Sequence, residues 1–313
     1  MSAASADTAS NPAPADAADK RVWLNGELVP ADRAAVSVFD HGLLYGDGVF
    51  EGMRVYAGRV FKLQTHLERL FDSAKAIRLD IPYAIDQLAE AVRETVGANG
   101  RENANGYIRL CVTRGNGPLG INPFICNGAS TFIIVDGIQL YPREMYEAGL
   151  AVITASTVRN HPQALSPRVK SMNYLNNVLA KIEAIDAGVL EAVMLNHEGF
   201  VGECTGDNVF IVRERGGVRT LVTPPLHAGI LEGVTRNVVM QLARDAGVPV
   251  MEADLTKFDL YTAEEMLLTG SAAEVIPVTK IDGRPVGEGR PGPITRDLIA
   301  SFQELVKRDA PED

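Results

Sequence analysis

Several residue types that mark large classes of protein are scarce in this sequence. Its 313 residues include three cysteines and five histidines, and neither type occurs at the spacing of a metal site. An odd number of cysteines without a pairing pattern fits free thiols in a reducing compartment better than a disulfide framework. The sequence therefore predicts free thiols and no catalytic metal.

Positive charge and long apolar runs are scarce as well. Lysine and arginine number 30 against 40 acidic residues, which gives a formal net charge of −10, and no basic stripe is present. This balance argues against nucleic acid as a partner. No apolar window reaches the roughly eighteen residues that a membrane span requires, so we expect no membrane association.

Residues 1–20 contain almost nothing that a core could bury. The segment consists mainly of alanine, serine, aspartate and proline, a composition typical of a disordered tail. It lacks the basic and apolar regions of a secretory signal, and no arginine precedes Arg21, which disfavours a mitochondrial transit peptide. We therefore expect a cytoplasmic protein whose folded part begins near residue 21.

The rest of the chain is long enough for two domains, and 46% of all residues are hydrophobic. The pattern of strands and helices predicts an α+β domain over residues 21–137, a short interdomain loop over 138–149, and a second domain of α+β or α/β class over 150–313. Within the first domain, the pair Asn25-Gly26 between two apolar runs predicts a β-hairpin.

The most distinctive segment is 166–179, SPRVKSMNYLNNVL, which contains Lys170, one of eight lysines. A lysine in apolar surroundings loses hydration, which favours the free amine, and a free amine attacks carbonyl groups to form a Schiff base. Taken alone, a surface lysine ahead of a helix explains the segment better. The apolar helical pattern that follows it comprises Met172, Leu175, Val178, Leu179, Ile182 and Ile185.

Two stretches of the second half predict anion sites made by backbone N–H groups. In GVTRNVVMQLARDAG, residues 233–247, a glycine precedes a helix for which Thr235 is the predicted N-cap. Free N–H groups at such a helix start bind phosphate, although an ordinary capped helix has the same pattern. The small-residue turn GSAA at 270–273 offers further N–H groups and a hydroxyl.

Two charged residues complete this set. Arg69 lies on an amphipathic helix predicted over 63–79, as either a solvated charge or a phosphate ligand. Glu203 falls at a strand end beside the turn TGDN, where an exposed carboxylate is the simpler interpretation. An amine, two anion sites, an arginine and a carboxylate are what pyridoxal phosphate (PLP) requires, because the protein must hold its phosphate, bond its aldehyde and keep its ring nitrogen protonated.

Sequence runs in a fixed order extend this pattern from about Val22 to the end of the chain. They are YGDGVFEGMRVYAGRVFKLQTHLERLFDSAKAI, YIRLCVTRGNGPLG, ALSPRVKSMNYLNNVLAKIEA, GECTGDNVFIV, ILEGVTRNVV and LLTGSAAEVIPV. In these runs the chain resembles the branched-chain amino acid aminotransferases, class IV aminotransferases among the fold type IV PLP enzymes. The resemblance implies the two-domain fold that this family shares with D-amino-acid aminotransferases.

The resemblance assigns residues to the reactive part of the cofactor. Lys170 matches the Schiff-base lysine, which also moves the proton between the substrate Cα and C4′ of the cofactor. Glu203 matches the carboxylate that bonds the pyridine nitrogen, and Tyr174 matches the tyrosine near the phenolic oxygen. Where the family commonly has EGTGDN or EGAGEN, this chain has ECTGDN, so that Cys204 stands in place of a glycine.

The phosphate site is implied in the same way. Arg69 matches the phosphate-binding arginine, and Val234 with Thr235 matches the N-terminal turn of a phosphate-binding helix. Ser271 stands where the family usually has threonine. Because the hydroxyl group is retained, we expect the phosphate contact to be retained too.

The resemblance also implies a pocket that accepts both a branched aliphatic side chain and the distal carboxylate of glutamate. Arg109, with Tyr45, matches the partner of that carboxylate, and Phe50 matches an apolar wall. An arginine that pairs with a carboxylate supplies direction as well as charge, which apolar walls cannot do.

Further residues are assigned to the α-carboxylate and to a second subunit. Tyr107 and the backbone of Ser271 and Ala272 match the site of the substrate α-carboxylate. Leu119 and Ile121 match loop residues that enter the pocket of the neighbouring subunit. A homodimer or a higher homo-oligomer is therefore implied, with amino acids and 2-oxo acids as the small-molecule partners.

The function that follows is PLP-dependent transamination of L-leucine, L-isoleucine and L-valine with 2-oxoglutarate. The alternatives are a D-amino-acid aminotransferase or an (R)-amine transaminase of the same fold, a 4-amino-4-deoxychorismate lyase, and a cofactor-binding protein without turnover. VFEGMR followed by YIR favours the branched-chain enzymes over the D-specific ones, and MNYLNNVL favours a transaminase over the lyase. The presence of both Lys170 and Glu203 disfavours a protein without turnover.

Overall fold

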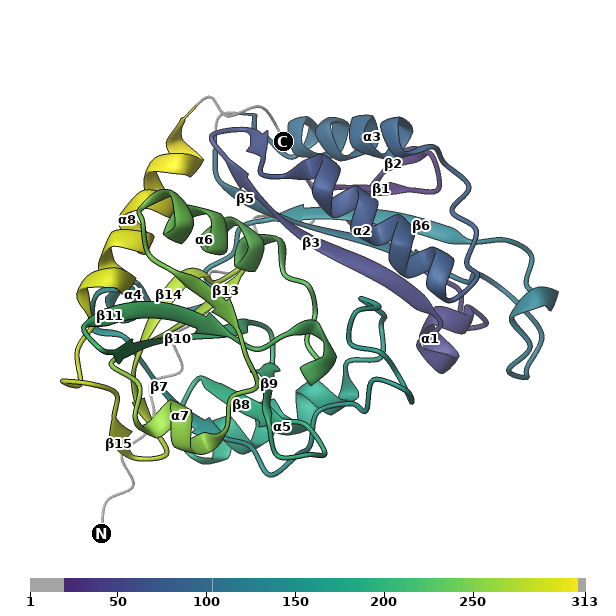
Figure 1. Ribbon diagram of the computed structural model, residues 1–313. Helices are drawn as coiled ribbons and strands as arrows, with labels where there is room; N and C mark the ends of the chain where they lie inside the picture. Colours follow the sequence, from purple (N-terminus) through teal and green to yellow (C-terminus); the bar gives the residue numbers. More distant parts are fainter. Residues whose placement is uncertain (1–19, 103, 309–313) are drawn as a thin grey trace, which may run out of the picture.

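The computed structural model describes residues 20–102 and 104–308 (Figure 1). Two β-sheets, each with helices packed on it, make up the described chain. The predicted mixed α and β architecture with two domains is therefore confirmed. Of the predicted disordered tail, only Lys20 belongs to the described residues, where its Nζ pairs with Asp136 at 2.5 Å.

The first sheet is antiparallel throughout and has the strand order β2-β1-β6-β5-β3-β4. The predicted hairpin joins β1 to β2, and Asn25 and Gly26 both have positive φ, as a tight two-residue turn requires. The strands are β1 (Arg21–Leu24), β2 (Glu27–Pro30), β3 (Gly48–Tyr56), β4 (Arg59–Val60), β5 (Gly106–Thr113) and β6 (Ser130–Asp136).

Helices α2 (Leu63–Ala76) and α3 (Ile85–Ala98) lie side by side over this sheet, as Figure 1 shows. The predicted amphipathic helix is thus confirmed as α2, and Leu67 and Leu70 on its apolar face are fully buried. The short helices of this half are η1 (Ala31–Arg33), α1 (His41–Tyr45) and η2 (Pro123–Ile125).

The second sheet is mixed, with the order β12-β11-β10-β13-β14-β7-β8-β9 and β15 paired to β14. Its parallel pairs are β11–β12, β14–β7 and β7–β8. The strands are β7 (Leu150–Thr154), β8 (Glu191–Leu195), β9 (Val201–Cys204), β10 (Asn208–Arg215), β11 (Val218–Thr223), β12 (Val250–Glu252), β13 (Glu265–Gly270), β14 (Glu274–Ile281) and β15 (Arg284–Pro285).

Helices α6 (Val234–Asp245) and α8 (Pro293–Lys307) pack together on this second sheet. Their buried residues, among them Val239 and Phe302, form one core cluster with Phe210 of β10. The remaining helices of this half are α5 (Leu175–Asp186), η3 (Leu226–Ala228) and α7 (Lys257–Tyr261).

The segment predicted as an interdomain loop, 138–149, contains helix α4 (Arg143–Ala148), which packs against β14. Tyr141 of the same segment is 1% exposed and belongs to the core of the second sheet. The exact domain limits, 21–137 and 150–313, remain a proposal.

Candidate active site

One pocket at the junction of the two sheets brings the predicted cofactor residues together. The side that belongs to the first sheet is formed by β3, α2 and β5, and the opposite side by β9, the start of α6 and the β13–β14 turn. Every residue that the resemblance assigned to the cofactor lines it: Arg69, Lys170, Tyr174, Glu203, Val234, Thr235 and Ser271.

Lys170 is held against the edge of β3. Its backbone C=O accepts a hydrogen bond from Phe50 N (3.0 Å), and its backbone N–H donates to Ser73 Oγ (3.2 Å). The Nζ donates to Tyr174 Oη at 3.2 Å, and it lies 4.6 Å from the centre of the Phe50 ring. The amine therefore faces the pocket between two aromatic rings, five residues before α5 begins.

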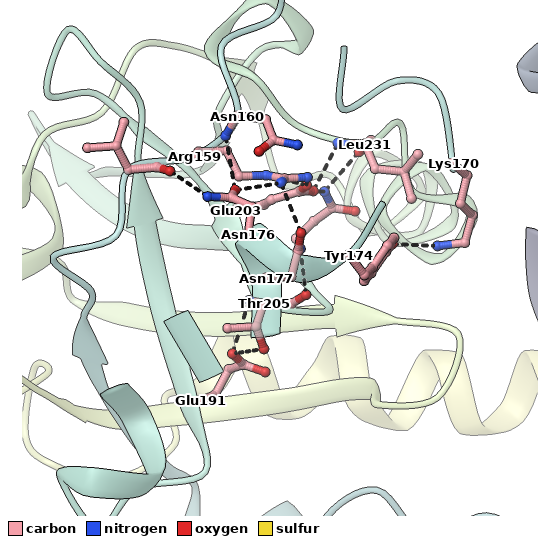
Figure 2. A network of polar contacts seen from close by, with 12 residues as sticks. Arg159, Asn160, Lys170, Tyr174, Asn176, Asn177, Glu191, Glu203, Thr205 and Leu231 are labelled. Atoms are coloured by element: carbon pink, nitrogen blue, oxygen red, sulfur yellow. Dashed lines mark hydrogen bonds and ion pairs between the residues drawn. The ribbon is translucent and has the colours of Figure 1, made fainter. Parts of the chain in front are cut away.

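Glu203, at the end of β9, is buried and not the exposed turn carboxylate of the simpler interpretation. Its Oε1 accepts bonds from Arg159 Nη2 (2.7 Å) and Nε (3.1 Å), as Figure 2 shows. Its Oε2 accepts bonds from Asn208 Nδ2 (3.1 Å) and Leu231 N (2.9 Å). Arg159 is itself buried and supplies the counter-charge that a buried carboxylate needs.

Cys204, which replaces the family's glycine, lies in β9, whose pairing with β8 shifts register between Val193 and Leu195. It is 1% exposed, it pairs with Val193 in the β8–β9 ladder, and it lines the pocket. Burial raises the pKa of its thiol well above the ordinary value, and the nearby Glu191 and Asp207 carboxylates add to the shift. The thiol is therefore protonated and packs as a small apolar group.

Arg69 and the start of α6 line a further part of the pocket. Arg69 Nη1 donates to the backbone C=O of Glu232 at 2.7 Å, which ties α2 to the loop before α6. The N-cap of α6 is Gly233 rather than the predicted Thr235, which lies in the first turn. A glycine N-cap has no side chain to accept hydrogen bonds, so the first-turn N–H groups face the pocket unshielded.

Two glycines are required here because other side chains occupy the space of a Cβ atom. A Cβ on Gly233 would lie 2.0 Å from Asn208 Oδ1, and the Nδ2 of the same Asn208 donates a hydrogen bond to Glu203. A Cβ on Gly52 would lie 2.0 Å from Tyr107 Oη. Each glycine therefore lets a polar side chain lie directly against the backbone.

The substrate residues divide into three groups. Tyr107, Ser271 and Ala272 line the pocket itself. Arg109 lies next to it, with Nη2 donating to Tyr107 Oη (3.4 Å) and its guanidinium carbon 4.4 Å from the centre of the Phe50 ring. Within the described part of the chain, Arg109 Nε is buried and has no hydrogen-bond partner.

Tyr45, Leu119 and Ile121 lie together but do not line this chain's own pocket. Gly120 N donates to Tyr45 Oη at 2.9 Å, which joins the loop to α1. Leu119 and Ile121 are 74% and 85% exposed, an unusual position for large apolar side chains.

Several functional candidates carried no signal in the sequence. Arg159 and Asn208 join Glu203 only through the fold, and Thr269, which lines the pocket, has a buried Oγ1 without a hydrogen-bond partner among residues 20–102 and 104–308. Asp207 also lines the pocket. Burial and the Glu191 carboxylate raise its pKa to about 7.

A model of the amino-transferase class IV family matches residues 48–281. The chain belongs to the class IV aminotransferase family. It is 49% identical over 285 residues to a Methanocaldococcus jannaschii protein provisionally named a branched-chain-amino-acid aminotransferase, covering 91% of this chain and 96% of that protein.

Two further relatives place the chain within this family. The branched-chain-amino-acid aminotransferase of Pseudomonas aeruginosa is 39% identical over 296 residues, covering 92% of this chain and 93% of that protein. The crystal structure of the branched-chain amino acid aminotransferase from Thermobaculum terrenum, in its PLP form, superposes with a TM-score of 0.83 at 32% identity, covering 93% of this chain and 94% of that chain. The family predicted from the sequence runs is confirmed.

Among the described residues, no three or more histidine, cysteine, aspartate or glutamate side chains are grouped so that they could hold a metal ion. No helix in that part of the chain has the length and apolar content to cross a membrane.

Proposed function

We propose that this class IV aminotransferase transfers the amino group of L-leucine, L-isoleucine and L-valine to 2-oxoglutarate, with PLP as its cofactor. One observation carries the proposal. A single pocket is lined by the amine of Lys170, by a buried carboxylate, Glu203, and by an anion site formed by Arg69 and the start of α6.

The residues present fit PLP at both ends. Thr269 Oγ1, buried and without a partner in the described chain, and the unshielded N–H groups of Val234 and Thr235 suit a phosphate group. Glu203 suits a protonated ring nitrogen, and Arg159 keeps its carboxylate in place. When bound, PLP supplies an aldehyde for amine exchange and a ring that accepts electrons.

Lys170 is the residue that moves protons. With PLP bound, its Nζ would take the proton from the substrate Cα and would return it at C4′, the general acid–base role of a positioned amine. Tyr174 accepts a hydrogen bond from Nζ and so keeps the amine on the pocket side of Phe50.

The unpartnered Nε of Arg109 supports the choice of substrates. Burying a guanidinium N–H without a partner costs free energy, and a carboxylate that accepts its hydrogen bond removes that cost. The distal carboxylate of glutamate would be such a partner. Phe50, beside Arg109, supplies apolar surface for a branched side chain. Tyr107 with the Ser271 and Ala272 backbone takes the α-carboxylate in this proposal.

We also propose that the chain forms a homodimer or a higher homo-oligomer. Leu119 and Ile121 are exposed and do not line their own pocket, and a second copy would bury them. Five apolar residues along one side of α5 support the same proposal, because all are between 47% and 69% exposed: Leu175, Val178, Leu179, Ile182 and Ile185. We also propose a cytoplasmic location, because Cys111, Cys126 and Cys204 are free thiols and form no disulfide with one another.

The first experiment is a half-reaction. The purified PLP-loaded protein is mixed with L-leucine and, separately, with D-alanine, without an amino acceptor, and the visible absorbance of the bound cofactor is followed. We expect loss of the band with L-leucine only and its return when 2-oxoglutarate is added. The Lys170→Ala variant should show neither change.

Each other outcome contradicts the proposal in a different way. Loss with D-alanine only would assign the protein to the D-specific enzymes and make the substrate roles of Tyr107 and Arg109 wrong. No reaction with either amino acid would favour a lyase or a protein without turnover. Turnover by Lys170→Ala at the wild-type rate would remove Lys170 from the chemistry.

A further inference from the structure

A buried acid and a buried histidine lie behind the phosphate-side arginine. Glu51 of β3 is 0% exposed and His66 of α2 is 1% exposed. Glu51 accepts two bonds from Arg69, Nε to Oε1 at 2.7 Å and Nη2 to Oε2 at 2.8 Å. His66 Nδ1 lies 2.7 Å from Glu51 Oε2. The three side chains form a continuous chain from the core to the pocket.

The protonation states of this chain follow from its surroundings. Burial by itself would raise the pKa of Glu51, but Arg69 and His66 outweigh it and hold that pKa far below the usual range. Burial lowers the pKa of His66, although Glu51 opposes the shift. Glu51 is therefore a carboxylate, and His66 is a neutral imidazole whose Nδ1–H donates to it.

The bonds of Arg69 determine which of its donors remain for a ligand. A guanidinium has five N–H groups in a rigid plane. Nε and one N–H of Nη2 are used by Glu51, and one N–H of Nη1 is used by the C=O of Glu232. Nη2 also lies 3.5 Å from His66 Nδ1, but a nitrogen that donates its hydrogen to Glu51 cannot accept one from Arg69. One N–H on each terminal nitrogen is therefore left, and the two together can bind two oxygens of one phosphate group.

We propose that Glu51 and His66 are positioning residues that hold Arg69 in the orientation that binds the cofactor phosphate. The inference rests on the proposed function, since it takes PLP as the ligand. An arginine side chain is long and flexible. If phosphate binding must also order this side chain, the lost conformational entropy weakens the binding. Glu51 orders it beforehand, and His66 orders Glu51.

The competing explanation is that the Glu51–Arg69 pair only ties α2 to β3. The two explanations differ in what they predict for pyridoxal, which is PLP without its phosphate. A positioning role affects PLP and leaves pyridoxal unchanged. A role in the general stability of the pocket affects both ligands to the same degree.

The test is Glu51→Gln, with dissociation constants for PLP and for pyridoxal measured on the apoprotein by absorbance titration. Glutamine presents one acceptor and one donor to an arginine edge that has two donors, so the two-bond contact cannot persist. We expect the constant for PLP to rise about tenfold or more, as for the loss of a charge-assisted bond, and that for pyridoxal to stay within about twofold.

A matched control is Asp47→Asn, because Asp47 forms a similar two-bond ion pair with Arg114, at 2.9 Å for both bonds, away from the pocket. It should change neither constant. Adding Glu51→Gln to Arg69→Gln should cause little further loss of affinity for PLP, since both substitutions act through the guanidinium of Arg69.

Substitutions of His66 provide a second test of the proposal if the Glu51→Gln protein does not fold. The amide N–H of His66→Asn can replace the Nδ1–H donor, whereas His66→Leu has no donor. We expect His66→Leu to weaken PLP binding selectively and His66→Asn to restore it. Equal weakening of PLP and pyridoxal, or no change for PLP, would overturn the inference. A wild-type protein that binds no PLP would instead refute the proposed function.

Discussion

At the scale of single residues, the buried charges of the pocket are matched in pairs that are distant in the sequence. Arg159 neutralises Glu203, and Glu51 pairs with Arg69. Asp207 is the exception: Glu191 pairs with Lys181 Nζ at 3.2 Å, whereas Asp207 shares the Tyr141 hydroxyl with Glu191, at 2.8 Å and 3.3 Å. One hydroxyl proton cannot serve two carboxylates fully, so a second proton between them is favoured.

The Asp207 pair predicts a specific dependence of stability on pH. Burial and Glu191 raise the pKa of Asp207 from 3.8 to about 7, so between these values the folded protein binds a proton that the unfolded chain releases. This group's stabilising contribution is therefore lost as pH rises from about 4 to about 7. In Asp207→Asn the free energy of unfolding should fall less steeply with pH, by up to about 1.4 kcal/mol per pH unit.

Urea unfolding of the PLP-saturated protein across this pH range measures the effect as the difference between variant and wild type. Asp186→Asn, at an exposed position of α5, is the control and should follow the wild-type curve. Parallel curves for Asp207→Asn and wild type would mean that Asp207 is ionised throughout the range.

At the scale of elements, α5 shows that an apolar stripe need not face the core of its own chain. The sequence pattern predicted this helix, yet its buried side carries Asn177, Ala180 and Ala184. Asn177 is buried because its side chain bonds Arg159 and the C=O of Thr205. The small alanines let α5 approach β8 closely, and the large apolar side chains point away from it.

We expect Ile182→Glu, in the middle of the exposed stripe of α5, to shift the protein to monomers and to lower its activity. A charge buried between two copies costs several kcal/mol, whereas on an exposed helix face it costs almost nothing. Light scattering after gel filtration measures the mass, and the half-reaction measures the activity.

The control for this prediction is Phe258→Glu on α7, which replaces an apolar residue that is 67% exposed outside the stripe. It should leave the mass unchanged. An Ile182→Glu protein that keeps the wild-type mass would show that the stripe is not an association surface.

At the scale of the whole molecule, the pocket depends on how the two sheets are joined. Glu274, which follows the 271–273 turn, accepts bonds from Arg54 Nη2 (3.1 Å) and Tyr56 Oη (2.8 Å) of β3. It also accepts a bond from Gln303 Nε2 of α8 at 2.8 Å. One carboxylate therefore connects the first sheet, the 271–273 turn and the last helix.

Glu274→Ala should lower the free energy of unfolding by about 3 kcal/mol, because it leaves Arg54 largely buried without its counter-ion. It should also raise KM for the amino acid, since the 271–273 turn loses its attachment to β3. Denaturant unfolding and steady-state kinetics measure the two effects. Glu288→Ala removes a fully exposed ion pair with Arg290 and should cost less than about 0.5 kcal/mol. Equal costs for the two variants would contradict the structural role of Glu274.

Local features of this protein were determined by the sequence alone. The Asn25-Gly26 hairpin and helix α2 follow from turn chemistry and hydrophobic period, which act over a few residues. The set of chemical groups around Lys170 and Arg69 could also be predicted, because ordered sequence runs preserve residue types and their spacing.

Burial and pairing were decided only by the tertiary structure. The partner of Glu203 is Arg159, 44 residues away, and no local pattern states which strands will be neighbours. The N-cap of α6 lies at Gly233, and the space that a Cβ would occupy there is filled by Asn208, a residue from another strand. The stripe of α5 faces outward for the same reason: a side chain's environment is set by the elements packed around it, which the chain acquires only when it folds.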